Sequence, residues 1–254
     1  MPGNRFKNEV KSARTTFEIL ELLKTKDGAT LTELTNEFEL SKSSIHNYLK
    51  TLENDGYVVQ QDNRYLPGLR LLDLGGFARH REQIYDIAKP EVEALAKKTG
   101  EMANLLVEQD GRGTYLYQAH GGDSVSTDSY IGQRVYLHNT ALGKAILAHI
   151  PRDEVDEIVE KHGLPGTTEA TVTDREALYE ELDRIEEWGV AFDREERVKG
   201  LRCVAAPIVN NNDIVEGAIS VSGPKSRMDE DRLDTLAKQL QDAINVIELN
   251  ITYT

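Results

Sequence analysis

The stretch LTELTNEFELSKSSIHNYLKTLENDGYV, residues 31–58, contains two helical patterns separated by a short break. Apolar residues recur at helical spacing from Leu31 to Phe38, which predicts a helix of two turns. After the break, Ser41 is placed to cap a second helix from Lys42 to Asn54. The apolar residues of this second helix share one face: Ile45, Tyr48, Leu49 and Leu52. Its opposite face is polar and carries Ser43, Ser44, His46, Asn47, Lys50 and Thr51.

The sequence on either side completes a recognisable pattern. On the N-terminal side, apolar residues from Arg14 to Leu23 predict another helix. On the C-terminal side, two β-prone runs, Tyr57 to Gln60 and Arg64 to Leu66, flank a polar turn and predict a hairpin. Helix, helix, turn, helix and hairpin in this order are typical of a winged helix-turn-helix domain, which we expect over residues 10–68.

The rest of the chain predicts an α+β domain. Residues 69–81 are expected to form a linker helix, and residues 82–254 a second domain in which strands and helices interleave. Short turns between the strands favour a mostly antiparallel sheet flanked by helices. The expected strands are Met102 to Val107, Thr114 to Ala119, Cys203 to Val209 and Ile214 to Ser222, and the expected helices include Ala141 to Ile150 and Asp229 to Leu249.

Composition excludes several classes of protein. The 254 residues include one cysteine, Cys203, so no intrachain disulfide can form. No run approaches the roughly 20 apolar residues that a membrane span needs. The first ten residues show no apolar core of a secretory signal. We therefore expect a cytoplasmic protein.

The net charge of -14 argues at first against a nucleic-acid partner, because affinity for phosphate comes from Lys and Arg. The charge is unevenly distributed, however. Residues 1–70 hold ten Lys+Arg and ten Asp+Glu, which leaves 20 and 34 for the remainder. The excess acidity therefore lies in the second domain and does not oppose DNA binding by the first. Such acidity also fits a protein that works in high internal salt, as in halophilic archaea.

Three stretches resemble the IclR family of transcriptional regulators: residues 31–58, LHNTALGKAILA at 137–148, and the run from Gly189 through GLRCVAAPIV to GAISVSGP. The resemblance implies an N-terminal winged helix-turn-helix that dimerises and a GAF-like C-terminal domain that binds an effector. It also implies dimers or dimers of dimers that control catabolic operons in response to small metabolites. Such a regulator needs no cofactor and is not an enzyme. The signature positions matched in the third stretch are Gly189, Asp193, Glu196, Cys203, Val204, Ala205, Ile208 and Asn210.

The polar face of the helix from Lys42 to Asn54 is the candidate DNA-reading surface. It carries no acidic residue between Ser41 and Leu52, although a solvated face of an ordinary helix has a similar composition. An amide can bind adenine bidentately in the major groove, so we assign Asn47 to base readout. We place Ser43, Ser44 and His46 beside it and assign Lys42 and Lys50 to phosphates. Arg64 in the wing contacts DNA or is an ordinary strand arginine.

The resemblance also implies an effector site, and the chemistry of its residues suggests a small hydroxylated acid or a sugar as the ligand. The matching residues are Ala141, Leu142, Gly143, Asp193, Cys203, Ser220 and Ser222. Ser220 and Ser222 are two apart on one strand, so both hydroxyls can reach one ligand, although strand serines also alternate toward solvent. The helix that begins after Asn139 and Thr140 offers free backbone N–H groups to a carboxylate.

Two alternatives compete with a ligand-responsive regulator. Cys203 with His120 or His138 would make a small hydrolase, although an apolar run favours an inert thiol. The helical segment could instead serve dimerisation alone. The histidines show no helical pairing, so we expect no metal site.

Overall fold

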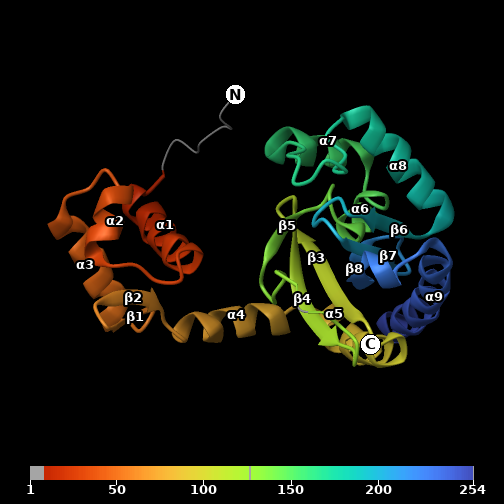
Figure 1. The fold of residues 1–254 in the computed structure, drawn as a ribbon, viewed down its shortest axis with the longest axis horizontal. Helices are drawn as coiled ribbons and strands as arrows, with labels where there is room; N and C mark the ends of the chain where they lie inside the picture. Colours follow the sequence, from red (N-terminus) through yellow and green to blue (C-terminus); the bar gives the residue numbers. More distant parts are fainter. Residues whose placement is uncertain (1–8, 126, 254) are drawn as a thin grey trace. The chain divides into compact units, whose positions relative to one another are not determined.

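The computed structural model describes residues 9–125 and 127–253. It divides into two compact units, with the boundary between Ala78 and Arg79 (Figure 1). None of the helices in these described ranges is long and apolar enough to cross a membrane.

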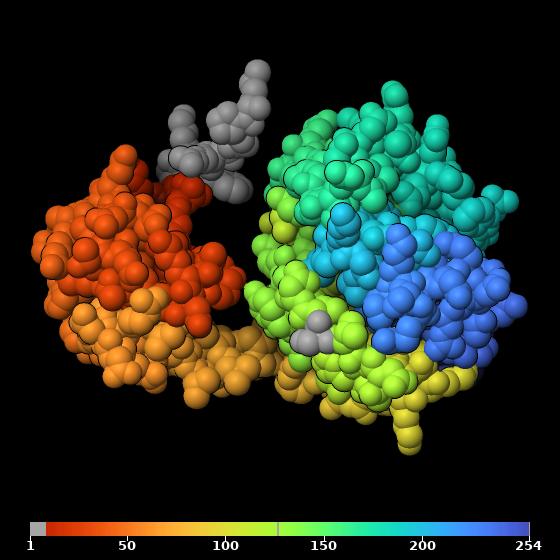
Figure 2. Space-filling view, in the orientation of Figure 1, coloured from red at the N-terminus to blue at the C-terminus, as the bar shows by residue number. Residues whose placement is uncertain are grey.

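The first unit consists of helices and one hairpin in the predicted order. Its elements are α1 (Lys11–Thr25), α2 (Leu31–Glu37), α3 (Lys42–Asn54), β1 (Val58–Gln61) and β2 (Arg64–Pro67), followed by α4 (Arg70–His80). The apolar faces of α1, α2, α3 and the hairpin meet in one core, which lies beneath the surface coloured red to orange in Figure 2, whereas α4 has no buried residue. The buried residues of this core are Ile19, Leu23, Ala29, Leu34, Ile45, Leu49, Leu52, Val58 and Tyr65.

Local capping explains where α2 and α3 begin. The side chain of Thr30 accepts a hydrogen bond from the backbone N–H of Glu33, whose own carboxylate accepts one from the N–H of Thr30, a reciprocal capping box. The hydroxyl of Ser41 accepts from the N–H of Ser44 at 3.1 Å, as its position before α3 predicts. Each cap satisfies backbone donors that the first turn of a helix leaves free.

The second unit is built on one six-stranded sheet. After α5 (Gln83–Thr99), the chain forms β3 (Met102–Gln109), β4 (Arg112–His120) and β5 (Arg134–Tyr136). Three helices and the remaining strands follow, and the chain ends in α9 (Glu230–Tyr253). The intervening elements are α6 (Ala141–Leu147), α7 (Arg152–His162), α8 (Arg175–Trp188), β6 (Ala191–Arg194), β7 (Leu201–Val209), β8 (Val215–Pro224) and a 3-10 turn, Lys225–Arg227. The strand order is β5-β4-β3-β8-β7-β6, and every neighbouring pair is antiparallel.

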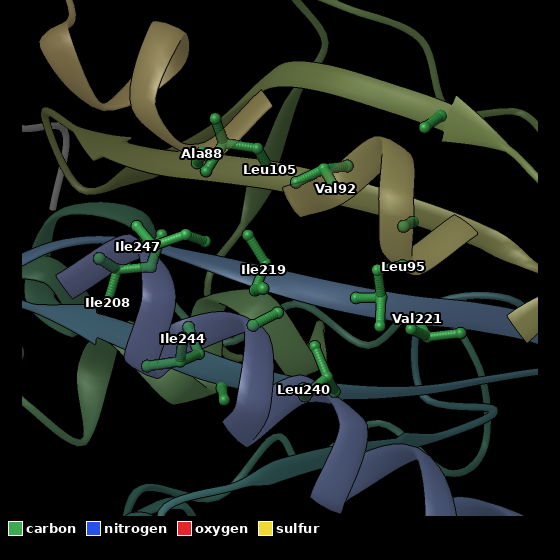
Figure 3. Packing of buried hydrophobic residues seen from close by; sticks show 14 of the residues in the cluster. Ala88, Val92, Leu95, Leu105, Ile208, Ile219, Val221, Leu240, Ile244 and Ile247 are labelled. Atoms are coloured by element: carbon green, nitrogen blue, oxygen red, sulfur yellow. The ribbon is translucent and has the colours of Figure 1, made fainter. Parts of the chain in front are cut away.

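Helices cover both faces of this sheet. On one face, α5 and α9 pack against each other and against the strands, so that Val92 and Ile244 meet Ile219 in a continuous core (Figure 3). On the other face, α6, α7 and α8 enclose a second apolar cluster that includes Leu142 and Leu182. The predicted α+β fold, with helices around an antiparallel sheet, is confirmed.

The structure adds two strands to the sequence prediction and moves the ends of two helices. The edge strands β5 and β6 were not predicted, because runs of three and four residues are too short to show alternation. Helix α6 ends at Leu147 instead of Ile150, in keeping with the bias against helical backbone before Pro151. Helix α9 extends to Tyr253, beyond the predicted end at Leu249.

Candidate functional site

The outward face of α3 is exposed to solvent. Lys42, Ser43, His46 and Asn47 are exposed, and Ser44 is half-buried. The hydroxyls of Ser43 and Ser44 already use part of their hydrogen-bonding capacity, because they lie 2.8 and 2.9 Å from the hydroxyl of the capping Ser41. Within the described residues, the side-chain amide of Asn47 has no hydrogen-bond partner, so its donor and acceptor are both available to a base edge.

Two of the predicted basic contacts are already paired within the unit. Lys50 donates to Glu53 at 2.6 Å, and this hydrogen bond raises the pKa of Lys50. Arg64 donates to the carbonyl of Gly28 and forms an ion pair with Glu33 at 3.5 Å. Arg64 therefore ties the hairpin to the start of α2, and any contact with DNA would require it to exchange these partners.

A small cavity lies in the second unit between α6 and the sheet; its free volume is about 20 Å³, room for a single water molecule. Six of the seven predicted effector residues line it: Ala141, Leu142, Asp193, Cys203, Ser220 and Ser222. The others that line it are Met102, Asn104, Tyr115, Ser129, Thr140, Arg197 and Leu201.

Gly143, the seventh predicted residue, is not part of the lining. A side chain there would place its Cβ 2.2 Å from the carbonyl oxygen of Leu137, so glycine allows α6 to approach that backbone. Its N–H donates to the hydroxyl of Thr140 at 3.0 Å. The predicted use of this helix start for a carboxylate is thus weakened, because the capping threonine already takes one N–H of a seven-residue helix.

The floor of the cavity is a hydrogen-bonded network across three strands. Ser220 and Ser222 lie on one face of β8, and the amide of Asn104 on β3 donates to their hydroxyls at 3.2 and 3.3 Å. The side-chain amide of Gln118 on β4 donates to the side-chain oxygen Oδ1 of Asn104 at 3.1 Å and to the hydroxyl of Ser129 at 2.8 Å. Asn104 and Gln118 were missed in the sequence, because nothing local links them to serines more than 100 residues away.

Asp193 is the acidic group of the lining. It accepts a hydrogen bond from the N–H of Glu196 at 2.7 Å. Burial and the nearby charge of Glu196 raise its pKa to about 7. The carboxyl can therefore donate or accept a hydrogen bond near neutral pH.

Behind this wall lies a buried charge cluster that sequence analysis missed. Lys144 on α6 is fully buried and donates to Glu181 at 2.5 Å and to Glu196 at 2.6 Å. One signal was available: Lys144 is the single charge in the apolar helix LHNTALGKAILA, and a buried lysine requires partners.

The arrangement does not support nucleophilic catalysis by Cys203. Burial raises the pKa of its thiol well above the usual value. No histidine lines the cavity; His138 lies 3.1 Å from the carbonyl of Pro165, and His120 interacts with Ser124. Among the described residues, no group of three or more His, Cys, Asp or Glu side chains could hold a metal ion.

Comparisons with known proteins identify relatives along nearly the whole chain. Residues 12–62 match the family model described as the IclR helix-turn-helix domain, and residues 77–249 match the one described as the bacterial transcriptional regulator IclR C-terminal. The chain is 32% identical to the probable HTH-type transcriptional regulator ArcR of Halobacterium salinarum, covering 95% of this chain and 94% of that protein. It is 33% identical to the HTH-type transcriptional regulator XynR of Escherichia coli, covering 92% and 94%. The crystal structure of the Thermotoga maritima IclR superposes with a TM-score of 0.77 at 31% identity, covering 95% and 99%.

Proposed function

From the premise that this chain belongs to the IclR family of transcriptional regulators, we propose how its two units divide the work. A winged helix-turn-helix at residues 10–68 binds operator DNA. A linker helix at 69–81 joins it to an effector-binding domain at 82–254, whose cavity takes a small metabolite. The relatives are regulators rather than enzymes, so the hydrolase alternative has no support.

The exposed face of α3 is the single observation that carries the DNA-binding assignment. In a chain with a net charge of -14, this face carries no acidic side chain between Ser41 and Leu52, and the amide of Asn47 has no hydrogen-bond partner among the described residues. Asn47 reads a base edge in the major groove, with His46 and Ser43 beside it, and Lys42 contacts a phosphate. Lys50 and Arg64 contact DNA only when they give up their ion pairs with Glu53 and Glu33.

We propose that the protein acts as a homodimer or a dimer of dimers. Large apolar side chains are exposed on α1 and also on α4, and exposed apolar side chains of this size are typical of surfaces that a partner covers. Phe17 is 68% exposed, Leu72 70% and Phe77 69%. A second copy that buries them would present two recognition helices to two half-sites of a palindromic operator.

Effector binding would regulate DNA affinity by linkage. A ligand that prefers one of two dimer geometries changes operator affinity when the two geometries bind the operator unequally, and operator DNA then changes ligand affinity by the same factor. The polar lining, with three serines, an amide and a carboxyl, suits a small hydroxylated acid or a sugar. We propose a cytoplasmic location, because that is where operator DNA lies. The excess acidic charge of the second unit suits a cytoplasm of high salt concentration, which screens its self-repulsion.

The test is binding of the purified protein to the DNA upstream of its own gene, with an unrelated fragment of equal length as the control. We expect sequence-selective binding whose affinity falls as salt rises. Binding that does not distinguish the two fragments would contradict the assignment. Unchanged selectivity in Asn47→Ala would favour a helix-turn-helix that serves dimerisation alone.

A further inference from the structure

The cavity has one positively charged side chain in its lining, Arg197, from the segment between β6 and β7. This side chain is 11% exposed, and its guanidinium forms an ion pair with Asp128 at 3.0 Å. Asp128 itself is 62% exposed and belongs to the segment between β4 and β5. A mostly buried cation at the cavity is therefore neutralised by a carboxylate that faces water.

The segment that carries Asp128 also closes one side of the cavity. Its neighbour Ser129 lines the cavity and accepts a hydrogen bond from Gln118 at 2.8 Å. Thr127 lies 2.7 Å from Ser129, hydroxyl to hydroxyl. Three polar contacts thus hold residues 127–129 to the cavity: Asp128 with Arg197, Ser129 with Gln118, and the hydroxyl of Thr127 with the sulfur of Met102.

No other cation in the lining competes with Arg197 for an anionic ligand. The nearby Lys144 lies outside the lining and is fully buried, and both Glu181 and Glu196 accept its hydrogen bonds. At the start of α6, which was predicted to hold a carboxylate, the N–H of Gly143 already donates to the hydroxyl of Thr140. Arg197 can instead bind a carboxylate with two parallel hydrogen bonds.

The pair with Asp128 is suited to exchange. An ion pair with an exposed partner contributes little to stability, and a carboxylate that leaves it is solvated by water. A ligand carboxylate inside the cavity would meet the same guanidinium away from water, where the attraction is stronger.

We propose that Arg197 is the carboxylate anchor of this cavity, and that an anionic ligand displaces Asp128 from it and so removes one of the contacts that hold residues 127–129. The proposal rests on the proposed function, since it takes the cavity to be the effector site. It narrows the effector class to small carboxylic acids, with hydroxyl groups reaching Ser220, Ser222 and Asp193, and disfavours neutral sugars. It also identifies residues 127–129 as the segment whose attachment to the cavity weakens when a ligand binds.

Cys203 provides a probe that requires no knowledge of the effector. It lines the same cavity and is the only cysteine of the chain. Iodoacetate and iodoacetamide are close in size and differ in charge, and in both cases the thiolate displaces iodide to form an S–C bond. Burial raises the pKa of this thiol and the charge of Arg197 lowers it, so a change at Arg197 also alters the fraction of thiolate. That fraction affects both rates equally and cancels in their ratio.

We expect the iodoacetate-to-iodoacetamide ratio for Cys203 to exceed that of glutathione about tenfold at low salt. Arg197→Met should bring the ratio down to that of glutathione, and Asp128→Asn should raise it, because the competing carboxylate is gone. Arg152→Met, which removes a surface arginine paired with Asp183, is the matched control and should leave the ratio unchanged.

Equal ratios in the unmodified protein and in Arg197→Met would overturn the proposal. So would alkylation of Cys203 by iodoacetamide without alkylation by iodoacetate, in the unmodified protein and in Asp128→Asn alike, since a two-carbon acid would then not reach Arg197. The assay contains no DNA, so its outcome is independent of operator binding: loss of operator binding with an intact ratio would contradict only the proposed function.

Discussion

The outward face of α3 and the cavity under α6 are both polar, but their polar groups are in opposite states. On α3, the amide of Asn47 and the side chains of Lys42 and His46 face water, and the contacts present are local, such as Lys50 with Glu53. In the cavity, Asn104 is bonded to Ser220, 116 residues away. Exposed groups remain hydrated without partners, whereas buried ones require them.

This difference determines how each site can respond to a partner. DNA that approaches α3 replaces water on groups that the protein does not use for its own stability. A ligand that enters the cavity must instead exchange hydrogen bonds that hold strands and loops together. Binding there changes the protein's internal contacts, which is what a regulated site requires.

The largest effect should follow from breaking the buried cluster behind the cavity. Lys144→Met leaves Glu181 and Glu196 without their cation, and we expect the free energy of unfolding to fall by about 3–5 kcal/mol. Burial raises the pKa of Glu196, and the charge and hydrogen bond of Lys144 are the main influences that oppose this, so Glu196 should take up a proton in the variant. Thermal unfolding of the full chain measures the loss.

The control is Lys161→Met, which removes an exposed lysine paired with Asp110. It should shift the melting temperature by about a degree at most. Adding Glu196→Gln to Lys144→Met should recover part of the loss. Similar shifts for Lys144→Met and Lys161→Met would mean that burial does not distinguish the two sites.

A second effect concerns the pH dependence that Asp193 gives to the cavity. Its pKa is about 7 in the folded chain and near the ordinary value of 3.8 when unfolded. Between these values the folded state holds a proton that the unfolded state has lost. The free energy of unfolding should therefore fall as pH rises through this window, by at most about 1.4 kcal/mol per pH unit.

Asp193→Asn removes this dependence. The stability of the unmodified protein relative to the variant should decline from pH 4.5 to pH 7 and become constant above. Ser222→Ala is the control, because it alters the same cavity without a titrating group and should give an offset independent of pH. Melting temperatures across the pH range decide the matter, and parallel curves for Asp193→Asn would refute the raised pKa.

The third effect tests the exposed site. Asn47→Ala should weaken binding to the operator by about 1–3 kcal/mol, measured by fluorescence anisotropy, and leave binding to unrelated DNA and the melting temperature unchanged. Asn54→Ala, at the end of the same helix, is the matched control and should change neither. A drop in melting temperature for Asn47→Ala would show that the amide supports the fold.

The two sites also differ in how far the sequence could predict them. Ser41, Asn47 and the apolar face of α3 belong to one helix, so periodicity and capping placed them. Six cavity residues were found only through the family resemblance. Arg197 and Asn104 were missed, because their roles depend on Asp128 and Ser220, which only the folded sheet brings near. The strands β5 and β6 were missed for a related reason, since pairing with a neighbour defines such short strands.

The smallest effect separates two lysines on α3. Lys42 has no ion pair within the described residues, so Lys42→Ala should lower the slope of log affinity against log salt by about 1, the value for one phosphate contact. Lys50→Ala should lower it less, because Glu53 already neutralises Lys50. Glu53→Gln should then raise the slope by freeing Lys50. If Lys50→Ala instead matches Lys42→Ala, then DNA phosphate displaces Glu53 as readily as water is displaced from Lys42. The face of α3 would then exchange an internal ion pair when it binds DNA, as proposed for Arg197 and Asp128 when the cavity binds a ligand. The two sites would then differ only in how deeply their polar groups are buried.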